Sequence, residues 1–466
     1  MTVEEDSPKA ANRRKKVGFA ESPLSPTPSA DSETKRVYGI VFVILLVDLL
    51  AFTCILPLFP ALFDYYGSHG EKDSTYSALQ NFVTRIQLSL GIAPSPKSNS
   101  VLFGGILGSL FSFLQFVASP IVGALSDVYG RKPILVITTI GIAISYLVWS
   151  FSTTFTLFVI ARIIGGISKG NISLGTAIVT DVSTPGTRGK GMAMVGIAFS
   201  LGFIIGPMIG AGFAAYSRRN GVVDIFLYPA LFSLLLQILD LLLVVKFLPE
   251  TLATTKRAKS VVQNLKESLN FIDPRRLVEF AAVKGLAAAD RVHIRRVGMA
   301  YFLYLFFFSG LEFTLTFLMH SRFQYDSEQQ GKMFLFIGII MILVQGGFVR
   351  RMAPGREKRT ALMGFGLTIP GFIIIALAGT QALVFLGLAL YSTGSAVVAP
   401  CLSTLVANYG RDDQKGTVLG IFRSLGALAR AFGPLFSSVL YWSFGPTVSY
   451  FIGGLMILFP LMILKR

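Results

Sequence analysis

The chain has 466 residues, of which 53% are hydrophobic and 14% are charged, and 40 of them are phenylalanine. This composition is too apolar for a soluble protein of this length and is typical of a membrane protein. The net charge of +17 does not indicate nucleic-acid binding, because the basic residues lie between long apolar stretches and not in one polar domain.

A membrane-spanning helix needs about 20 mostly apolar residues, and twelve stretches meet this requirement. In chain order they are 37–62, 101–125, 133–151, 155–179, 191–214, 225–248, 297–320, 332–349, 360–378, 382–406, 416–440 and 447–464. Residues 1–36 are polar and rich in proline and serine, and we expect them to form a disordered cytoplasmic tail. The predicted fold class is an all-α membrane protein with twelve transmembrane helices.

The longest polar interruption, 250–296, separates the sixth span from the seventh. It predicts two six-helix halves, 37–249 and 297–466, joined by a basic cytoplasmic linker. Within the linker Val261, Val262, Leu265 and Leu269 recur at helical spacing, which fits either a surface-lying amphipathic helix or a simple polar tether.

Lysine and arginine fall in alternate loops, which predicts the orientation of the chain. The basic loops share one side of the membrane with both termini, and that side is expected to be cytoplasmic. The residues concerned include Lys35, Arg36, Arg131, Lys132, Arg188, Lys190, Arg350, Arg351, Lys465 and Arg466.

The loop after the second span reads GALSDVYGRK from Gly123 and holds one acid and two bases in a glycine-framed turn. Asp127 can meet the positive end of a neighbouring helix, and Arg131 can pair with an acid such as Asp181. We expect such contacts to latch the two halves on the cytoplasmic side, the alternative being an ordinary charged turn. The predicted gate residues are Gly123, Asp127, Gly130, Arg131, Lys132 and Asp181.

The fifth span carries small residues at every fourth position, at Gly202, Gly206 and Gly210, with Pro207 beside the second of them. Small residues let another helix approach closely, and an internal proline bends the helix. The pattern fits either close helix packing alone or a role in substrate exchange.

Charged residues inside spans cost a few kcal/mol each by insertion scales, so they usually face partners or a water-filled cavity. The acids are Asp48 and Glu312, and the bases are Arg162, Lys169, Arg423 and Arg430. Each pair of bases is seven residues apart and therefore shares one helix face. Asp240 and Lys246 lie near a predicted span end, where we expect them to reach the membrane interface.

Two basic stripes and two separate acids predict a cavity that attracts an anion while the acids carry protons, the alternative being interhelical salt bridges. A proton switch would place Asp48 or Glu312 beside Arg162 or Arg423. Polar residues expected to line the cavity are Gln115, Ser200, Tyr304, Gln345 and Tyr391. The stripe Tyr301, Tyr304, Phe308 and Glu312 offers stacking to a flat substrate.

These residues resemble the drug and proton antiporter branch of the major facilitator superfamily, and within it the animal tetracycline-transporter-like proteins. The likeness rests on VDLLAFTCILPLFP from Val47, ARIIGGISKGNISLGTAIVTD from Ala161 and GTVLGIFRSLGALARAFGPL from Gly416. The superfamily signature G-x-L-x-D-x-x-G-R-K matches from Gly123, and the antiporter signature G-x-x-x-G-P-x-x-G matches from Gly202.

The resemblance implies twelve helices, alternating access and transport of organic anions. It makes Asp48 the acid of the first helix and Arg162 the start of R-x-x-x-G-x-x-x-G. The second-half copy of the gate, at 347–351, lacks the acid. The family is linked to the plasma membrane and to internal membranes such as the nuclear envelope.

We therefore expect a secondary transporter of small organic anions, coupled to protons by exchange and monomeric in the lipid bilayer, with no cofactor, metal or nucleic acid. No HExxH, GxSxG or P-loop pattern occurs in the loops between the predicted spans, so no enzyme activity is expected. Two other functions fit the sequence: efflux of cationic or tetracycline-like drugs with Asp48 and Glu312 as counter-ions, and a transporter-shaped scaffold.

Overall fold

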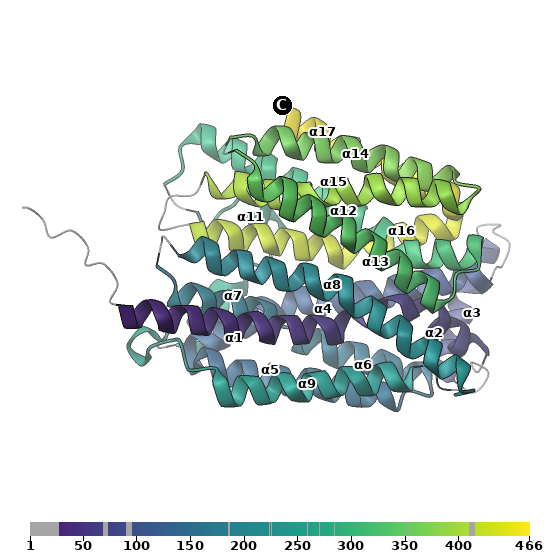
Figure 1. Cartoon of the computed structure of the whole chain (residues 1–466), viewed down its shortest axis with the longest axis horizontal. Coiled ribbons are helices and arrows are strands. Elements are labelled where there is room, and N and C mark those ends of the chain that lie inside the picture. The colour runs from purple at the N-terminus through teal and green to yellow at the C-terminus, as the bar shows by residue number, and fades with distance from the viewer. Residues whose placement is uncertain are drawn as a thin grey trace, which may run out of the picture.

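The computed structural model describes residues 28–68, 73–89, 96–184, 187–222, 224, 226–258, 260–269, 271–283, 285–353, 355–409 and 415–466. These residues fold into helices without any strand, and the long helices lie along the long axis of one bundle (Figure 1). The expected all-α fold is confirmed. Most of the predicted tail falls on residues 1–27, which lie outside the described residues, and α1 already begins at Pro28.

The N-terminal half contains α1 to α9, with bounds that follow the apolar stretches. They are α1 (Pro28–Thr53), η1 (Leu56–Leu58), α2 (Phe59–Ser68), α3 (Ser74–Ser89), α4 (Pro96–Tyr129), α5 (Arg131–Ser150), α6 (Phe155–Ser168), α7 (Asn171–Val182), α8 (Arg188–Arg219) and α9 (Leu227–Phe247).

The linker contributes short helices and the C-terminal half the remaining long ones. They are η3 (Thr254–Lys256), α10 (Val261–Leu269), α11 (Pro274–Val278), α12 (Ala288–Phe323), α13 (Ser327–Leu343), η4 (Val344–Phe348), η5 (Val349–Arg351), α14 (Glu357–Leu377), α15 (Gln381–Ala407), α16 (Lys415–Met456) and α17 (Leu458–Lys465).

Eleven stretches of the described residues are long and apolar enough to cross a membrane, and the last of them, Thr417–Lys465, provides two crossings. A straight helix of its 49 residues would be about 74 Å long, far beyond the apolar thickness of a bilayer. The chain leaves helical geometry at Gly445, where φ is 79° and ψ is 172°. The break falls between the two predicted spans 416–440 and 447–464.

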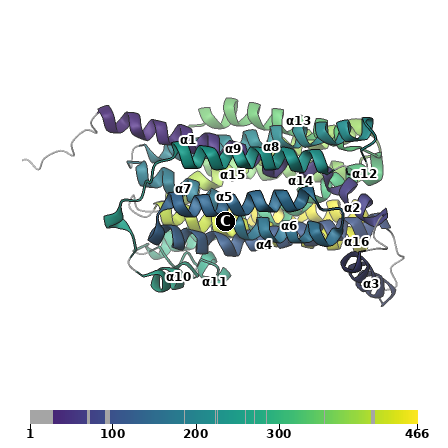
Figure 2. The same cartoon turned by 90° about the horizontal axis from the view of Figure 1, so that it is seen from below.

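The two halves meet along two seams, α4 against α16 and α8 against α13. In Figure 1 the N-terminal half lies below and the C-terminal half above. The linker helices lie at the end where α1 begins, called the linker end from here on, whereas α2 and α3 lie at the opposite α3 end (Figures 1 and 2). Helix α10 covers the predicted amphipathic segment and packs against α4, and α11 packs against α16.

A buried carboxylate fastens α3 to the bundle. Asp73 accepts hydrogen bonds from the backbone N–H groups of Thr75, Tyr76 and Thr156 at 2.9, 3.2 and 2.9 Å, and from the Thr156 hydroxyl. Burial by itself raises the pKa of Asp73, but these hydrogen bonds to the ionised form outweigh it and hold the pKa below its usual value. These hydrogen bonds to Asp73 therefore contribute their full stability above the ordinary titration range of an aspartate. They are lost only when stronger acid protonates Asp73.

Candidate functional site

An ion pair lies in the core of the N-terminal half. The Nζ atom of Lys169 lies 2.7 and 2.6 Å from the two carboxylate oxygens of Asp48, and the two residues are 2% and 0% exposed. Nζ also lies 4.8 Å from the centroid of the Phe52 ring. Each of these two charges is stabilised by the other, because an isolated ion in a low-dielectric interior strongly destabilises the fold.

The helix that carries Lys169 is broken at this residue. The predicted span 155–179 falls within the span Phe155–Val182, but it is interrupted, since α6 ends at Ser168 and α7 begins at Asn171. Gly170, at the break, lets α4 approach closely, because a Cβ atom there would lie 2.5 Å from Val122 Cγ1. Interrupted helices recur at the binding sites of secondary transporters, where free backbone groups face the ligand.

Arg162, on α6, is buried among aromatic rings. Its guanidinium carbon is 5.1 Å from the centroid of Phe111 and 5.7 Å from that of Phe158, and the residue is 4% exposed. Its Nε atom is buried without a hydrogen-bond partner. Within the part of the chain that the structure describes, no carboxylate forms an ion pair with Arg162.

Arg162 and Lys169 line the same small pocket, which has room for about one water molecule in this conformation. Its walls include Phe52, Phe111 and Tyr146, with the first two rings stacked at 5.3 Å. Since Asp48 neutralises Lys169, the pocket retains the charge of Arg162. A buried guanidinium of this kind can form charge-assisted hydrogen bonds with an acidic group.

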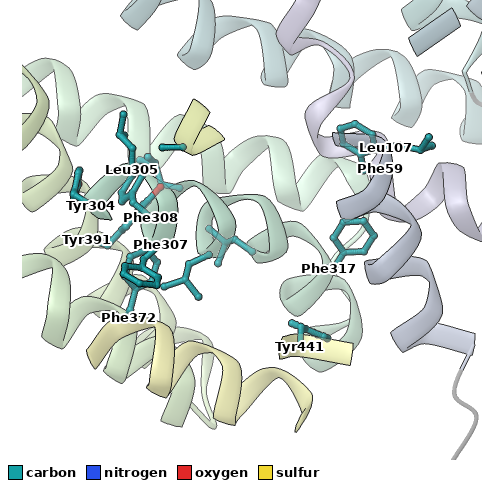
Figure 3. Packing of buried hydrophobic residues seen from close by; sticks show 14 of the residues in the cluster. Phe59, Leu107, Tyr304, Leu305, Phe307, Phe308, Phe317, Phe372, Tyr391 and Tyr441 are labelled. Atoms are coloured by element: carbon teal, nitrogen blue, oxygen red, sulfur yellow. The ribbon is translucent and has the colours of Figure 1, made fainter. Parts of the chain in front are cut away.

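A second cluster lies in the C-terminal half around Glu312. The Tyr391 hydroxyl donates to Glu312 Oε1 at 3.1 Å. Phe308 stacks between Tyr391 and Tyr304, with ring centroids 5.3 and 5.1 Å away (Figure 3). This cluster places one carboxylate at the edge of an aromatic stack.

The basic stripe of α16 belongs to this second cluster. The side chains of Arg423 and Arg430 are exposed, and both lie within electrostatic range of Tyr301. Arg430 is also within range of Glu312. The structure thus separates the six predicted charged residues into a buried N-terminal trio and a more accessible C-terminal trio.

The pairing expected between acids and arginines is wrong. Asp48 meets Lys169 and not Arg162, and the hydrogen-bond partner of Glu312 is Tyr391, with Arg430 and not Arg423 in electrostatic range. Residues seven apart share a helix face only approximately, because seven residues are not a whole number of turns. In addition, α6 ends at Ser168, so Lys169 does not continue the helix face of Arg162.

Asp240 was wrongly expected at the membrane interface. It is fully buried, its Oδ2 accepts a hydrogen bond from Gln237 Nε2 at 3.3 Å, and its Oδ1 has no partner. It interacts electrostatically with Asp48 and Lys169. Lys246, six residues further along α9, is exposed as expected. Asp240 interacts with Asp48 of α1 and Tyr146 of α5, and Lys246 lies on a different face of α9 because six residues turn a helix by about 600°.

Two of the remaining predicted polar residues, Ser200 and Gln345, meet across the seam between the halves, and the third, Gln115, lies on α4. The Ser200 hydroxyl donates to Gln345 Oε1 at 3.2 Å across this seam, and Gln115 is half-buried on α4. Gln345 lies in η4, a π-helical turn that continues α13. Such turns concentrate at functional sites, and no pattern in the sequence indicated this one.

The predicted gate residues form one network at the linker end. Arg131 Nε lies 2.9 Å from Asp181, and its NH1 group contacts Asp127 at 2.5 Å and Ser126 at 2.6 Å. Lys132 Nζ donates to the carbonyl of Val245 at 2.8 Å. Each of these contacts lies within the N-terminal half, so in this conformation they stiffen that half and do not latch it to the other.

Sequence reasoning missed one member of this network, Glu250. Its carboxylate accepts the backbone N–H groups of Arg131 and Lys132 at 3.0 and 3.2 Å, capping the start of α5. Gly130 permits this contact, because its φ is 106° and a Cβ atom would lie 2.4 Å from Glu250 Oε2. One signal in the sequence could have identified Glu250. It is an acidic residue just after the sixth predicted span, at the same end of the bundle as the start of α5, which has no capping side chain of its own.

The glycines of α8 face α1. A Cβ atom at Gly202, Gly206 or Gly210 would lie 2.5, 1.9 or 1.8 Å from Leu49 Cβ, Thr53 Oγ1 or the Cys54 carbonyl oxygen. On another face α8 packs against Gly331 and Gly338 of α13. The motif therefore makes the close contact between α8 and the helix that carries Asp48.

The α3 end is closed by contacts between the halves. Two ion pairs cross it, Arg218 with Asp326 at 3.3 Å and Arg219 with Glu328 at 3.4 Å, and His320 Nε2 lies within hydrogen-bonding distance of Asp64 Oδ2 at 2.9 Å. Phe59 meets Phe313 with ring centroids 5.6 Å apart, and Phe63 meets Phe317 at 6.2 Å. Figure 3 shows one ring of each pair, Phe59 and Phe317. Polar pairs and aromatic rings thus seal this end of the interface.

Two six-helix halves around buried charges define a class of protein, the polytopic secondary transporters. The family model of the Major Facilitator Superfamily matches residues 41–434 and 355–464, and the chain belongs to this superfamily. It is 45% identical to major facilitator superfamily domain-containing protein 10 of Mus musculus over 448 residues, which cover 95% of each chain. It is 25% identical to the class B tetracycline resistance protein of Escherichia coli over 344 residues, 72% of this chain and 78% of the relative.

Solved structures show the same architecture. The crystal structure of the human organic anion transporter MFSD10 (TETRAN) is 44% identical, covers 92% of this chain and 99% of its own, and superposes with a TM-score of 0.77. A D-xylose–proton symporter, 17% identical over 93% of this chain and 97% of its own, shares the fold with a TM-score of 0.63. The chain is thus a multi-pass integral membrane transporter of a small-molecule substrate.

Proposed function

We propose that this chain transports small organic anions by alternating access, as a monomer and coupled to protons. The observation that carries the proposal is Arg162, a buried guanidinium without an ion-pair partner among the described residues, which lines an aromatic pocket. A carboxylate, sulfonate or phosphate group of a substrate would supply the missing counter-charge. The similar human protein, described as an organic anion transporter, supports the same substrate class.

The Asp48–Lys169 pair supports proton coupling, because Lys169 lines the same pocket as Arg162. A bound anion competes with Asp48 for Lys169, and a carboxylate that loses its partner in a buried site takes up a proton. Anion and proton then bind together, so the geometry supports co-transport over the exchange suggested by sequence resemblance. Glu312, beside Arg430 and Tyr391, is the corresponding acid of the other half.

Replacing Arg162 with glutamine is expected to lower anion uptake about tenfold to a hundredfold, since a hydrogen bond to a charged group contributes about 1.5–3 kcal/mol. The measurement is uptake of labelled organic anions and cations into proteoliposomes, with the pH gradient imposed in each direction. Arg291→Gln, an exposed arginine of α12, serves as the matched control and should retain uptake.

The outcomes of this assay separate the candidate functions. Anion uptake that rises with an acidic exterior supports co-transport, and a rise with an acidic interior supports exchange. Uptake of cations alone would replace the anion proposal with cation efflux, with Asp48 and Glu312 as counter-ions. Failure of the wild-type protein to move any labelled compound would favour a scaffold.

We also propose that the linker end faces the cytoplasm. Basic residues gather there, including Arg131, Lys132, Arg275 and Arg276, and positive loop charge predicts the cytoplasmic side. Trypsin should therefore leave the exposed Arg275–Arg276 pair intact in sealed cells and cut it after permeabilisation. Cleavage in intact cells would reverse the assignment.

A further inference from the structure

The buried cluster of the N-terminal half contains two carboxyl groups but one ammonium group. Asp48 uses both carboxylate oxygens on Lys169. Asp240, on α9, is 0% exposed and interacts electrostatically with both of them. Its Oδ1 has no hydrogen-bond partner. The pair Asp48–Lys169 is neutral, and no base forms an ion pair with Asp240 among the described residues, so an ionised Asp240 would lack a direct counter-charge.

The groups around Asp240 favour the protonated, neutral form of its carboxyl group. Helix α9 packs against α1, α5 and α8. The titratable groups that face Asp240 are Asp48 from α1, Tyr146 from α5 and Lys169 from the helix break, and no group of α8 interacts with it in the described residues. An ionised carboxylate with one unsatisfied oxygen is strongly disfavoured here, whereas a protonated one is not.

Gln237 supplies the partner that a protonated Asp240 needs. Its Nε2 lies 3.3 Å from Asp240 Oδ2, and its own Oε1 is buried without a partner. The two ends of an amide side chain are interchangeable by a half-turn. Turned over, Gln237 presents an acceptor to Asp240, and an O–H group on the carboxyl then donates to it.

We propose that Asp240 is a second proton-carrying residue of this transporter, sharing one proton with Asp48 through competition for Lys169. When Lys169 moves from Asp48 to Asp240, the O–H bond at Asp240 breaks and an O–H bond at Asp48 forms. Lys169 keeps its three protons, and the total charge of the cluster is unchanged. This step, which rests on the proposed proton-coupled transport, releases Lys169 from Asp48 without leaving a bare charge.

The test is Asp240→Asn, which copies the neutral acid in shape but cannot give up a proton. The variant should fold with an unchanged melting temperature and should still exchange labelled for unlabelled anion in the absence of a pH gradient. Stimulation of uptake by a pH gradient should fall at least about tenfold, within the usual range of coupling between two binding events. Asp240→Glu should recover part of the stimulation, and Lys246→Gln, on the same helix, should change neither readout.

Each outcome decides the proposal. Equal stimulation of Asp240→Asn and the wild-type protein would overturn it and leave proton-coupled transport standing. Loss of folding, or loss of gradient-free exchange by folded Asp240→Asn, would show that Asp240 is an ionised structural or substrate-binding residue and would also overturn it. Absence of stimulation in the wild-type protein would instead remove the proton coupling on which the proposal rests.

Discussion

Replacing Lys169 with methionine should destabilise the folded protein by about 3–5 kcal/mol, the usual cost of removing one partner of a buried ion pair. Asp48 is fully buried and loses both of its hydrogen bonds to Nζ. The destabilisation should shrink as the pH falls, because a protonated Asp48 no longer needs a counter-charge. Thermal unfolding in detergent across a pH series measures both effects.

The double variant Asp48→Asn with Lys169→Met provides the control. With both charges removed, the stability should return close to that of the wild-type protein, since apolar replacements of buried pairs are often neutral or stabilising. Stimulation of uptake by a pH gradient should not return, because the proposed proton site is gone. A single variant Lys169→Met as stable as the wild-type protein at neutral pH would show that Asp48 finds another partner.

The spans could be predicted from sequence because each depends on a local property, the length of an apolar stretch. All twelve predicted spans fall on helical stretches, but the first runs from α1 through η1 into α2, the fourth covers both α6 and α7, and α12 begins at Ala288, nine residues before the predicted span. The break at Lys169 was missed because hydropathy continues through it. Gly170 and Asn171 directly after the lysine are the local signal, since both residue types favour turns.

The identity of the charged residues could also be predicted, but their partners could not. Burial of Asp48, Arg162 and Lys169 follows from their positions deep within spans. Partners depend on helix rotation and tilt, which are set by packing between distant segments. Asp240 shows the error this causes: it was assigned by distance from a helix end, whereas its side of α9 faces α1 and α5.

Replacing Gly210 with alanine should destabilise the protein by at least about 3 kcal/mol, at the upper end of the cost of overpacking. The new Cβ atom would lie 1.8 Å from the Cys54 carbonyl oxygen, and this backbone atom cannot turn aside as a side chain can. Gly212→Ala is the matched control on the same helix, because nothing lies within 4 Å of its Cβ position. Melting temperatures of the two variants make the comparison.

Transport by the surviving folded Gly210→Ala protein distinguishes packing from a role in the transport cycle. The glycines face α1, within the N-terminal half, whereas α13 meets α8 on another face. Alternating access opens the seam with α13, but α1 and α8 can move together as one body. Uptake per folded molecule and its pH dependence should therefore stay unchanged. An altered pH dependence in a stable Gly210→Ala protein would mean that the α1–α8 contact itself rearranges when Asp48 changes partner.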